Sequence, residues 1–376
     1  MAIFVNRTLN LKKIKLIGFD MDYTLVPYHT RKFEELTHRL AREQLIRWGY
    51  PEDIRSLEFD FHRAIVGLVI DKRYGNLLQL NRYNKVKLSY HGLNEISFAR
   101  QNELYSNVAI DLSDKDYQSL DTSFAIAYGV LFSQLVQMKD DGAQLPDYHR
   151  IDSDIMQAID QIHRDGSLKE ILRSNFAEYV IDDPDTAPML ERLKQYGKKL
   201  MIITNSDYEY TKALLDYALT PHLREHESWL DLFDLIITLA QKPRFFERGS
   251  SFLKVDPETG LMSNWIGPIS SGIFQGGAYT GIQEGFGFQG KEILYIGDHI
   301  YGDVVSIKKR CSWRTALVLG DLEDEMRGLH DAHTTQQQID GLMDKKGVLE
   351  KQINTFELQR HNGKQGTGRE IDRLFR

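Results

Sequence analysis

The sequence predicts an α/β fold in which a parallel sheet is flanked by helices and a second, mainly helical region is inserted after the first strand. Short apolar runs typical of buried strands alternate with stretches of helical spacing. About 160 residues of strongly helical pattern separate the first run from the second. Because 376 residues exceed what a single hydrophobic core usually supports, we expect two packed units and an appendage.

Five apolar runs are the predicted strands of the sheet. The first covers residues 14–19 and ends at Asp20. The later runs are residues 199–205, 232–239, 292–298 and 315–319. Helical spacing in the segments between them, for example in residues 187–196 and 208–217, predicts the helices that cover the sheet.

The inserted region combines helical and alternating patterns. Residues 33–48, 123–138 and 151–163 have helical spacing. Residues 77–90 alternate and predict a hairpin with Asn84 near its turn.

These patterns divide the chain into a core, a cap and a tail. We expect residues 1–29 and 187–320 to form the core, and residues 30–186 to form an inserted cap. Residues 321–376 form a helical tail, expected to fray from about Gly363. Its isolated apolar residues predict an exposed helix pair, which is compatible with a homo-oligomer.

Composition narrows the classes of partner. A hydrophobic content of 41% and a charged content of 27% are typical of a globular protein. The formal net charge of −7 argues against a nucleic-acid partner held by a broad basic surface. The single cysteine, Cys311, excludes an intrachain disulfide. We find no signal-peptide pattern and no apolar run of roughly 20 residues, so we expect a cytoplasmic protein without a membrane partner.

Polar residues follow the predicted strands where ligands bind in doubly wound folds. The pattern Asp-x-Asp-x-Thr begins at Asp20 and includes Asp22. Asp and Thr are also common at ordinary strand-to-loop junctions, where they bind backbone groups. The second strand leads to Thr204, Asn205 and Ser206, whose hydroxyl and amide groups suit phosphoryl oxygens but would equally cap the next helix.

Two further strands add charged residues. Lys242 follows an apolar run, although an isolated lysine there is usually a solvated loop residue. The last segment, residues 297–303, carries Asp298 and Asp303 five positions apart. Carboxylates of this kind are the hard ligands that Mg²⁺ prefers. Together these residues suggest phosphate and metal chemistry.

The order of these four motifs resembles that of the haloacid dehalogenase superfamily. More narrowly, residues 19–25, 241–246 and 293–303 resemble the cytosolic purine 5′-nucleotidases, and the likeness extends from about residue 4 to residue 320. The resemblance implies a Rossmann-like core with a cap inserted after the first strand.

The resemblance also implies roles for the core residues. Asp20 would be the nucleophile that becomes an aspartyl-phosphate, and Asp22 the general acid and base. Mg²⁺ would be held by Asp20, the backbone carbonyl of Asp22 and Asp298. Four of the remaining motif residues would bind phosphate: Thr204, Asn205, Ser206 and Lys242. Asp303 would orient the metal's water shell or Lys242.

Cap segments resemble the same family. By that likeness Phe124 would stack on the base, Asp160 and His163 would contact base or ribose, and Lys169 would approach the phosphate. Each is equally compatible with ordinary helix surface or core. Purine-selective members carry an arginine four residues before the position of Asp160, where this chain has Met156.

This departure leaves the preference among IMP, GMP and other nucleotides open, with Arg150 or Arg164 as alternative donors. Two other patterns carry less weight. The glycine pattern at residues 285–290 precedes a strand, unlike a dinucleotide-binding loop. His299 is interpreted as a loop residue rather than a zinc ligand.

The leading hypothesis is a Mg²⁺-dependent 5′-nucleotidase acting on purine nucleoside 5′-monophosphates. The first alternative is a phosphatase or phosphotransferase that uses another small phosphate ester. The second is a catalytically inactive nucleotide-binding protein, which the combination of Asp20, Asp22, Lys242 and Asp298 disfavours.

Overall fold

The computed structural model describes residues 5, 8–320 and 322–361. Leu9–Val318 form one compact unit, which contains both the core and the cap. The helices α12 (Leu322–Asp331) and α13 (His333–His361) belong to a second unit.

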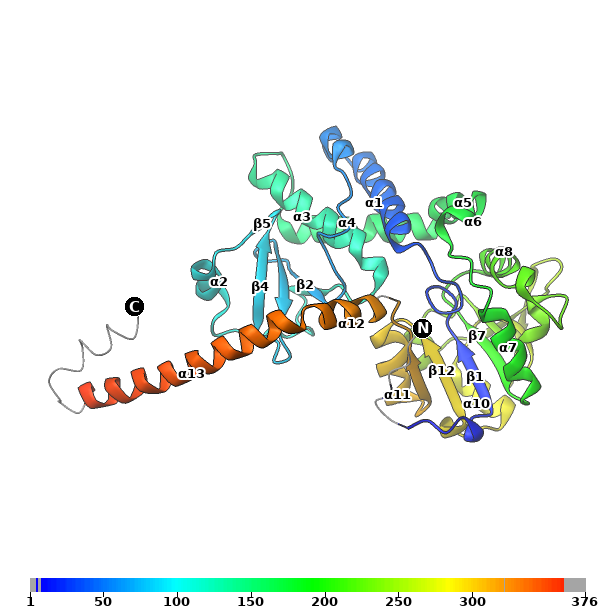
Figure 1. Cartoon of the computed structure of the whole chain (residues 1–376). Coiled ribbons are helices and arrows are strands. Elements are labelled where there is room, and N and C mark those ends of the chain that lie inside the picture. The colour runs from blue at the N-terminus through cyan, green and yellow to red at the C-terminus, as the bar shows by residue number, and fades with distance from the viewer. Residues whose placement is uncertain (1–4, 6–7, 321, 362–376) are drawn as a thin grey trace. The chain divides into compact units, whose positions relative to one another are not determined.

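The larger sheet has eight strands in the order β10-β9-β11-β8-β7-β1-β12-β13. Figure 1 labels three of its strands, β7, β1 and β12. Every neighbouring pair from β11 to β13 is parallel, whereas β9 is antiparallel to both β10 and β11. The predicted α/β fold class with a parallel sheet is therefore confirmed. The strands are β1 (Leu16–Phe19), β7 (Lys199–Ile203), β8 (Leu235–Thr238), β9 (Phe252–Val255), β10 (Met262–Trp265), β11 (Gly272–Gly276), β12 (Ile293–Gly297) and β13 (Arg314–Leu317).

The sheet is larger than the sequence predicted. All five expected strands are present, but β9, β10 and β11 were not expected. The strand β11 is five residues long with glycine at both ends, so its apolar signal is too short to stand out. The expected strand over residues 232–239 is shorter, because Trp229–Leu232 forms a 3-10 turn whose tryptophan is buried.

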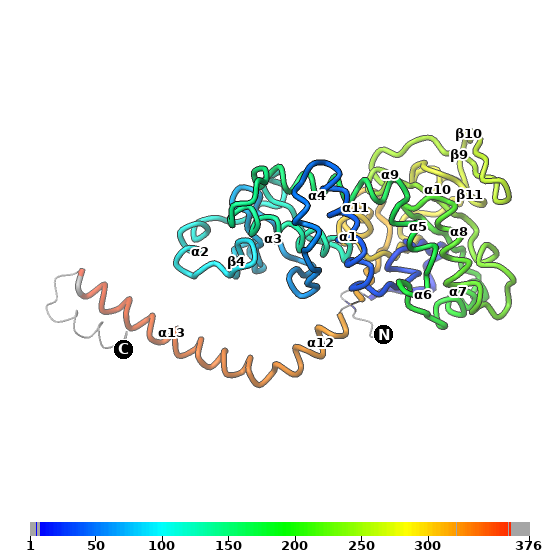
Figure 2. Tube along the Cα trace, turned by 90° about the horizontal axis from the view of Figure 1, so that it is seen from above, coloured from blue at the N-terminus to red at the C-terminus, as the bar shows by residue number. Residues whose placement is uncertain are grey.

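Both faces of the sheet are covered, as the apolar character of its strands requires. Along β7, Leu200 and Ile202 pack in the cluster that includes α7 (Thr186–Gln195) and α8 (Tyr208–Ala218). Met201 and Ile203 pack in the opposite cluster, which includes residues of α9 (Arg244–Glu247), α10 (Tyr279–Phe286) and α11 (Ser306–Arg310). Figure 2 shows α7 and α8 grouped together beside this sheet.

The inserted region contains six helices and a sheet of its own. The helices are α1 (Thr30–Arg47), α2 (Phe98–Tyr105), α3 (Ile126–Asp140), α4 (Tyr148–Arg164), α5 (Ser167–Ser174) and α6 (Phe176–Tyr179). The sheet is antiparallel, in the order β5-β4-β3-β2-β6. Its strands are β2 (Leu68–Asp71), β3 (Asn76–Leu80), β4 (Val86–His91), β5 (Asn94–Glu95) and β6 (Tyr117–Ser119).

The predicted hairpin is the pair β3 and β4, and Asn84 lies in its turn with a φ of 57°. The inserted region contains more sheet than the predicted hairpin alone, because the hairpin forms part of a five-stranded sheet. The outer strands β5 and β6 have only two and three residues, which is too short for a period-2 pattern to appear.

The chain enters and leaves the cap along two adjacent segments. His29 donates its backbone N–H to the Tyr179 carbonyl at 2.7 Å, and Ile181 donates to the Pro27 carbonyl at 2.9 Å. The second segment lies a few residues before the predicted boundary at residue 187. The division into residues 1–29 with 187–320, and 30–186, stays a prediction.

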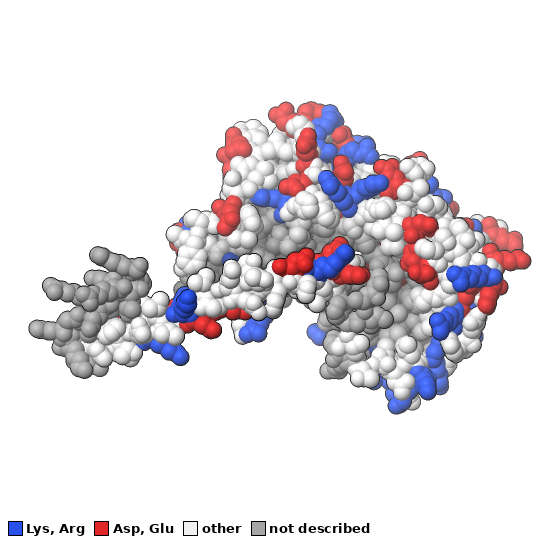
Figure 3. All heavy atoms as spheres, in the orientation of Figure 1, with Lys and Arg blue, Asp and Glu red and all other residues white. Residues whose placement is uncertain are grey.

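The second unit contains two helices, α12 and α13, in the region predicted to be a helical tail. Leu342, Met343 and Leu349 on α13 are exposed. The expected fraying from Gly363 lies outside the described residues, and the homo-oligomer stays a prediction. Among the described helices, none combines the length and apolar character needed to cross a bilayer. Figure 3 shows acidic and basic side chains intermixed on one face of the molecule.

Candidate active site

Strand ends of the core bring together one lysine and three carboxylates. Asp20 follows β1, Lys242 lies beyond β8, and Asp298 and Asp303 follow β12. The Lys242 Nζ lies 2.6 Å from Asp20 Oδ2 and 3.0 Å from Asp303 Oδ1, and it donates to the Tyr295 hydroxyl at 3.1 Å. Carboxylate oxygens of Asp20, Asp298 and Asp303 all lie within 4.8 Å of one another.

The Asp303 carboxylate packs closely against the backbone of Gly297, the last residue of β12. A Cβ atom at Gly297 would lie 2.4 Å from Asp303 Oδ2, so only glycine leaves room for this carboxylate. His299 donates its backbone N–H to the same oxygen at 3.2 Å. Its ring accepts from the backbone N–H groups of Tyr301 and Gly302. His299 therefore caps the helical segment Ile300–Val305, in keeping with its interpretation as a loop residue.

The electrostatics of this cluster favour a bound cation. Burial and the neighbouring Asp303 raise the pKa of Asp298 to about 7. Burial also raises the pKa of Asp20, although the adjacent Lys242 opposes this effect. Burial disfavours the charge on Lys242, but Asp20 and Asp303 outweigh it and raise the lysine pKa. One ammonium group does not offset three carboxylates, so further positive charge would stabilise the site.

Asp22 lies apart from the lysine and carboxylate cluster and is surrounded by hydroxyl groups. The Tyr28 hydroxyl donates to Asp22 Oδ1 at 2.6 Å, and Ser206 Oγ donates to Asp22 Oδ2 at 3.2 Å. The hydroxyls of Tyr28 and Tyr210 lie 3.2 Å apart. Burial raises the pKa of Asp22, while the bonds from Tyr28 and Ser206 act in the opposite direction. An aspartate whose pKa is raised, with hydroxyl donors to stabilise its charged form, is suited to proton transfer.

The segment after β7 links these two sets. Thr204 Oγ1 accepts from the Ser206 backbone N–H at 3.0 Å, which leaves the threonine hydroxyl hydrogen available. Asn205 Oδ1 accepts from the Lys242 backbone N–H at 2.7 Å, and Asn205 Nδ2 donates to the Lys242 carbonyl at 3.3 Å. Asn205 therefore fixes the loop that presents Lys242. The predicted phosphate-binding roles of these residues stay predictions.

Two of the predicted cap residues reach the core. Lys169 Nζ lies 2.5 Å from Asp207 Oδ2 and 5.2 Å from the centre of the Tyr210 ring. His163 donates through Nδ1 to the Ile159 carbonyl of its own helix, at 2.7 Å. Burial lowers the pKa of His163, and the charges of Lys169 and Asp22 also act on it. Lys169 and His163 therefore lie towards the Asp22 side of the site.

The other polar cap residues are engaged on the surface of α4. Asp160 is exposed and pairs with Arg164 at 2.8 Å. Arg150 pairs with Asp154 at 2.8 Å. Both arginines that could replace the missing base donor therefore already have carboxylate partners on their own helix.

Phe124 belongs to an aromatic cluster that joins cap and core. Its ring centre lies 4.7 Å from that of Tyr23, with the rings at 87°, and 5.3 Å from that of Phe33. Tyr23 in turn lies 5.1 Å from Tyr28. Because Tyr23 directly follows Asp22, Phe124 is held next to the Asp-x-Asp-x-Thr motif. Its stacking on a base stays a prediction.

Sequence reasoning missed the tyrosines of this site. Tyr28 contacts Asp22 and Tyr210, and Tyr295 contacts Lys242. Tyr28 and Tyr210 lie outside the motif segments, and Tyr295 lies within residues 293–303 but was assigned no role there. The Tyr28–Tyr210 contact spans 182 positions, so only the folded chain shows it.

Comparison with known proteins identifies the family. The sequence pattern described as the 5′ nucleotidase family matches residues 3–374 of this chain. The chain belongs to the 5′ nucleotidase family.

Curated relatives of this 5′ nucleotidase family member are longer than it is. A 5′-nucleotidase domain-containing protein of Dictyostelium discoideum is 28% identical over 359 residues, which cover 93% of this chain and 60% of the relative. Human 5′-nucleotidase domain-containing protein 2 is 28% identical over 366 residues, which cover 92% of this chain and 68% of the relative.

Solved structures are more distantly similar. A protein of Bacteroides fragilis described as a haloacid dehalogenase-like hydrolase has 18% identity and a TM-score of 0.32, covering 80% of this chain and 86% of its own. A predicted phosphoglycolate phosphatase of Haemophilus somnus has 12% identity and a TM-score of 0.32, covering 84% and 98%.

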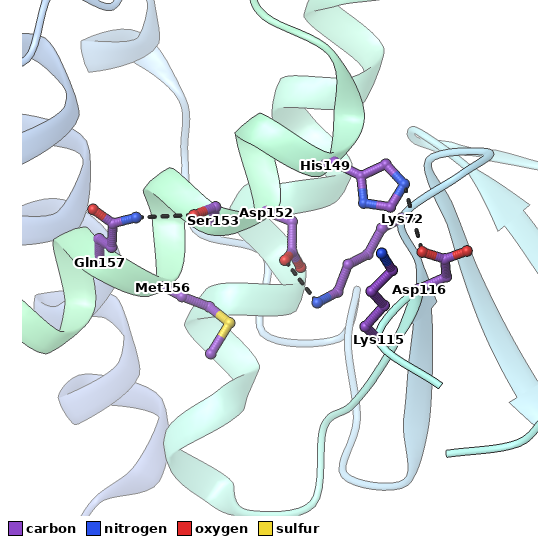
Figure 4. Close-up of a pocket in the computed structure, with 8 residues that line it drawn as sticks. All are labelled: Lys72, Lys115, Asp116, His149, Asp152, Ser153, Met156 and Gln157. Atoms are coloured by element: carbon purple, nitrogen blue, oxygen red, sulfur yellow. Dashed lines mark hydrogen bonds and ion pairs between the residues drawn. The ribbon is translucent and has the colours of Figure 1, made fainter. Parts of the chain in front are cut away.

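The cap of this 5′ nucleotidase family member contains a cavity of about 550 Å³ beside α4 (Figure 4). Met156, the residue in place of the expected arginine, lines it and is 43% exposed. Within the cavity Lys72 pairs with Asp152 at 3.0 Å. The other lining residues are Lys115, Asp116, His149, Ser153 and Gln157.

The glycine pattern at residues 285–290 has a packing explanation in this 5′ nucleotidase family member. A Cβ atom at Gly285 would come within 2.0 Å of the Ile269 carbonyl oxygen. The pattern spans the end of α10 and the approach to β12, so it does not open a helix after a strand. This position agrees with the interpretation that the glycine pattern is not a dinucleotide-binding loop.

Proposed function

We propose that the protein is a Mg²⁺-dependent 5′-nucleotidase that hydrolyses purine nucleoside 5′-monophosphates of the IMP or GMP type through an aspartyl-phosphate on Asp20. Family membership supports the broader class of phosphoric monoester hydrolase. The observation that carries the proposal is the pairing of Lys242 with Asp20 and Asp303, with the protonatable Asp22 nearby.

The chemistry divides into two steps. In the first, a carboxylate oxygen of Asp20 forms a bond to phosphorus while the bond from phosphorus to the ribose 5′-oxygen breaks. Asp22 gives its proton to that oxygen, and Tyr28 and Ser206 stabilise the carboxylate that remains. In the second, Asp22 takes a proton from water, the water oxygen attacks phosphorus, and Asp20 is released with inorganic phosphate.

Lys242 supports both steps because its ammonium group offsets negative charge on Asp20 and on the phosphoryl oxygens. The hydroxyl of Thr204 has a free hydrogen and would donate to a phosphoryl oxygen. Asn205 would contribute mainly by holding the Lys242 loop, and Ser206 by its bond to Asp22.

The carboxylate cluster fits a magnesium ion. Its ligands are hard oxygens, and its net negative charge is not offset by Lys242. Asp20, Asp298 and the backbone carbonyl of Asp22 would hold the ion, with Asp303 behind them. When bound, Mg²⁺ would reduce the repulsion between the Asp20 carboxylate and the phosphate ester.

The cap would supply recognition of the nucleoside. Phe124 would stack on the base, Asp160 and His163 would contact base or ribose, and Lys169 would exchange its Asp207 partner for the phosphate. We further expect a cytoplasmic location. The substrate would be a small nucleotide, and neither nucleic acid nor a membrane would be a partner.

A phosphate-release screen tests this function. Purified protein is assayed with IMP, GMP, AMP, pyrimidine monophosphates and sugar phosphates, with Mg²⁺ and then with EDTA. We expect purine 6-oxo monophosphates to be the best substrates and EDTA to abolish turnover reversibly. Preference for a sugar phosphate would replace the nucleotidase with a phosphatase of different specificity, and undiminished turnover in EDTA would remove the metal.

A further inference from the structure

Glu34 is a carboxyl group buried completely inside the cap, with an exposed fraction of 0%. It lies on α1, and its Oε2 accepts a hydrogen bond from the Ala127 backbone N–H at 2.7 Å. The backbone N–H of the preceding residue, Ile126, donates to the Ser123 carbonyl instead. Glu34 Oε1 has no hydrogen-bond partner. Full burial of a carboxyl with so few partners is costly, so packing alone does not account for it.

The N–H group that Glu34 binds belongs to Ala127, in the first turn of α3. Groups at this end of a helix have no partner within the helix and need one from elsewhere. Ala125, the residue before α3, has no side chain to accept them, and the first turn contains no acidic residue. A glutamate from another helix therefore caps α3.

The capped turn directly follows Phe124. Phe124 lies in the 3-10 turn Ser123–Ala125, two residues before Ile126. Phe33, the neighbour of Glu34 on α1, packs against the Phe124 ring at 5.3 Å between centres. Tyr23 from the catalytic loop packs against the same ring at 4.7 Å. Two consecutive residues of α1 thus contact this segment, Glu34 at the Ala127 backbone and Phe33 at the Phe124 ring.

We propose that Glu34 is a positioning residue that fixes the start of α3 and thereby holds the Phe124 ring beside Tyr23 for contact with the nucleoside. The proposal rests on the proposed function, because it assigns Glu34 to nucleoside recognition and not to phosphoryl transfer. It adds a specificity-determining residue that itself touches neither phosphate nor base.

Three variants separate this role from simple stability. Glu34→Met keeps the length of the side chain but removes both acceptor oxygens. Glu34→Gln keeps one acceptor oxygen. Thr37→Val is the matched control, because Thr37 is also buried on α1 and bonds only to the Phe33 carbonyl, at 3.1 Å. Each is assayed with IMP and with p-nitrophenyl phosphate, which leaves the base site empty, and its melting temperature is measured.

We expect Glu34→Met to raise KM for IMP by about five- to 50-fold and to change kcat/KM for p-nitrophenyl phosphate by less than about twofold, since only the nucleoside contact is lost. Glu34→Gln should restore the IMP value to within about threefold of wild type. Thr37→Val should lower the melting temperature without changing the ratio of the two substrates.

Equal losses on both substrates in a folded Glu34→Met protein would overturn the proposal, as would no loss on either. If this variant does not fold, Glu34→Asp, which withdraws the carboxyl by one methylene, should show the same selective rise in KM. Failure of wild-type protein to hydrolyse any nucleoside monophosphate would instead reject the proposed function. In that case faster amide exchange in residues 122–130 of Glu34→Met, absent in Thr37→Val, would still test whether Glu34 holds the Phe124 turn.

Discussion

The two ends of the candidate site are built differently. The phosphoryl end comes from strand ends of the core, where Lys242 contacts Asp20 at 2.6 Å and Asp303 at 3.0 Å within one buried cluster. The proposed nucleoside end comes from the cap, where Asp160 is exposed and Phe124 is only partly buried. The core end is thus preorganised by charge, whereas the cap end depends on how neighbouring side chains hold each residue.

This difference teaches where each kind of function resides. The core cluster contacts no group that could distinguish one phosphate ester from another. Under the proposed function, selectivity would come from the cap, and changes at the two ends should be separable by substrate.

The largest expected effect comes from the core. Asp20→Asn should reduce kcat by more than about 10³-fold on both IMP and p-nitrophenyl phosphate, because a carboxamide is a poor nucleophile. Steady-state kinetics on the folded variant, verified by its melting temperature, provide the measurement. An affinity-tagged mock purification excludes contaminating phosphatase. If activity above a few per cent of wild type then remains, Asp20 is not the nucleophile.

A smaller and selective effect is expected at the cap. Phe124→Ala should remove roughly 1–3 kcal/mol of binding to purine monophosphates, which is about five- to 150-fold in kcat/KM. Turnover of p-nitrophenyl phosphate should be nearly unchanged. Phe124→Tyr, which keeps the ring, is the control. A parallel loss on both substrates would mean that Phe124 supports the Tyr23 loop and does not read the base.

The smallest effect concerns stability and pH. Burial raises the pKa of Glu34 to about 8, against the opposing bond from the Ala127 backbone N–H. Because the folded state binds this proton more tightly than the unfolded state, stability from Glu34 is complete below its ordinary pKa and is lost as pH rises through about 8. Glu34→Gln cannot ionise, so its melting temperature should exceed that of wild type by roughly 2–8 °C near pH 9.5, and the difference should shrink as pH falls and be smallest near about pH 4. An identical pH profile in the two proteins would show that Glu34 does not titrate in this range.

The core was predictable from sequence because each motif residue directly follows an apolar run. Asp20, Lys242 and Asp298 are found in that way, since parallel strands deliver their carboxyl ends to one edge. Glu34 and Tyr210 could not be found, because their partners lie 93 and 182 positions away. No local pattern marks such contacts.

The same limit applies to the fold. The buried strand β1 has four apolar or glycine residues in a row, which sequence reasoning recognises. The cap strand β5 has two exposed residues and pairs only because β4 lies beside it. Short edge strands are specified by their neighbours and not by their own residues.

A phosphoenzyme trap tests the central claim, that phosphoryl transfer passes through Asp20, most directly. In Asp22→Asn the second step lacks its base, while p-nitrophenolate leaves without needing a proton, so the first step can still proceed. With p-nitrophenyl phosphate and Mg²⁺, we predict a burst of about one nitrophenolate per enzyme and a phosphoryl group, labile to hydroxylamine, on the peptide that contains Asp20. Transfer through Asp20 would be contradicted if wild-type protein turned over substrate but the variant gave neither the burst nor the modified peptide. A phosphoryl group on a different residue would contradict it as well.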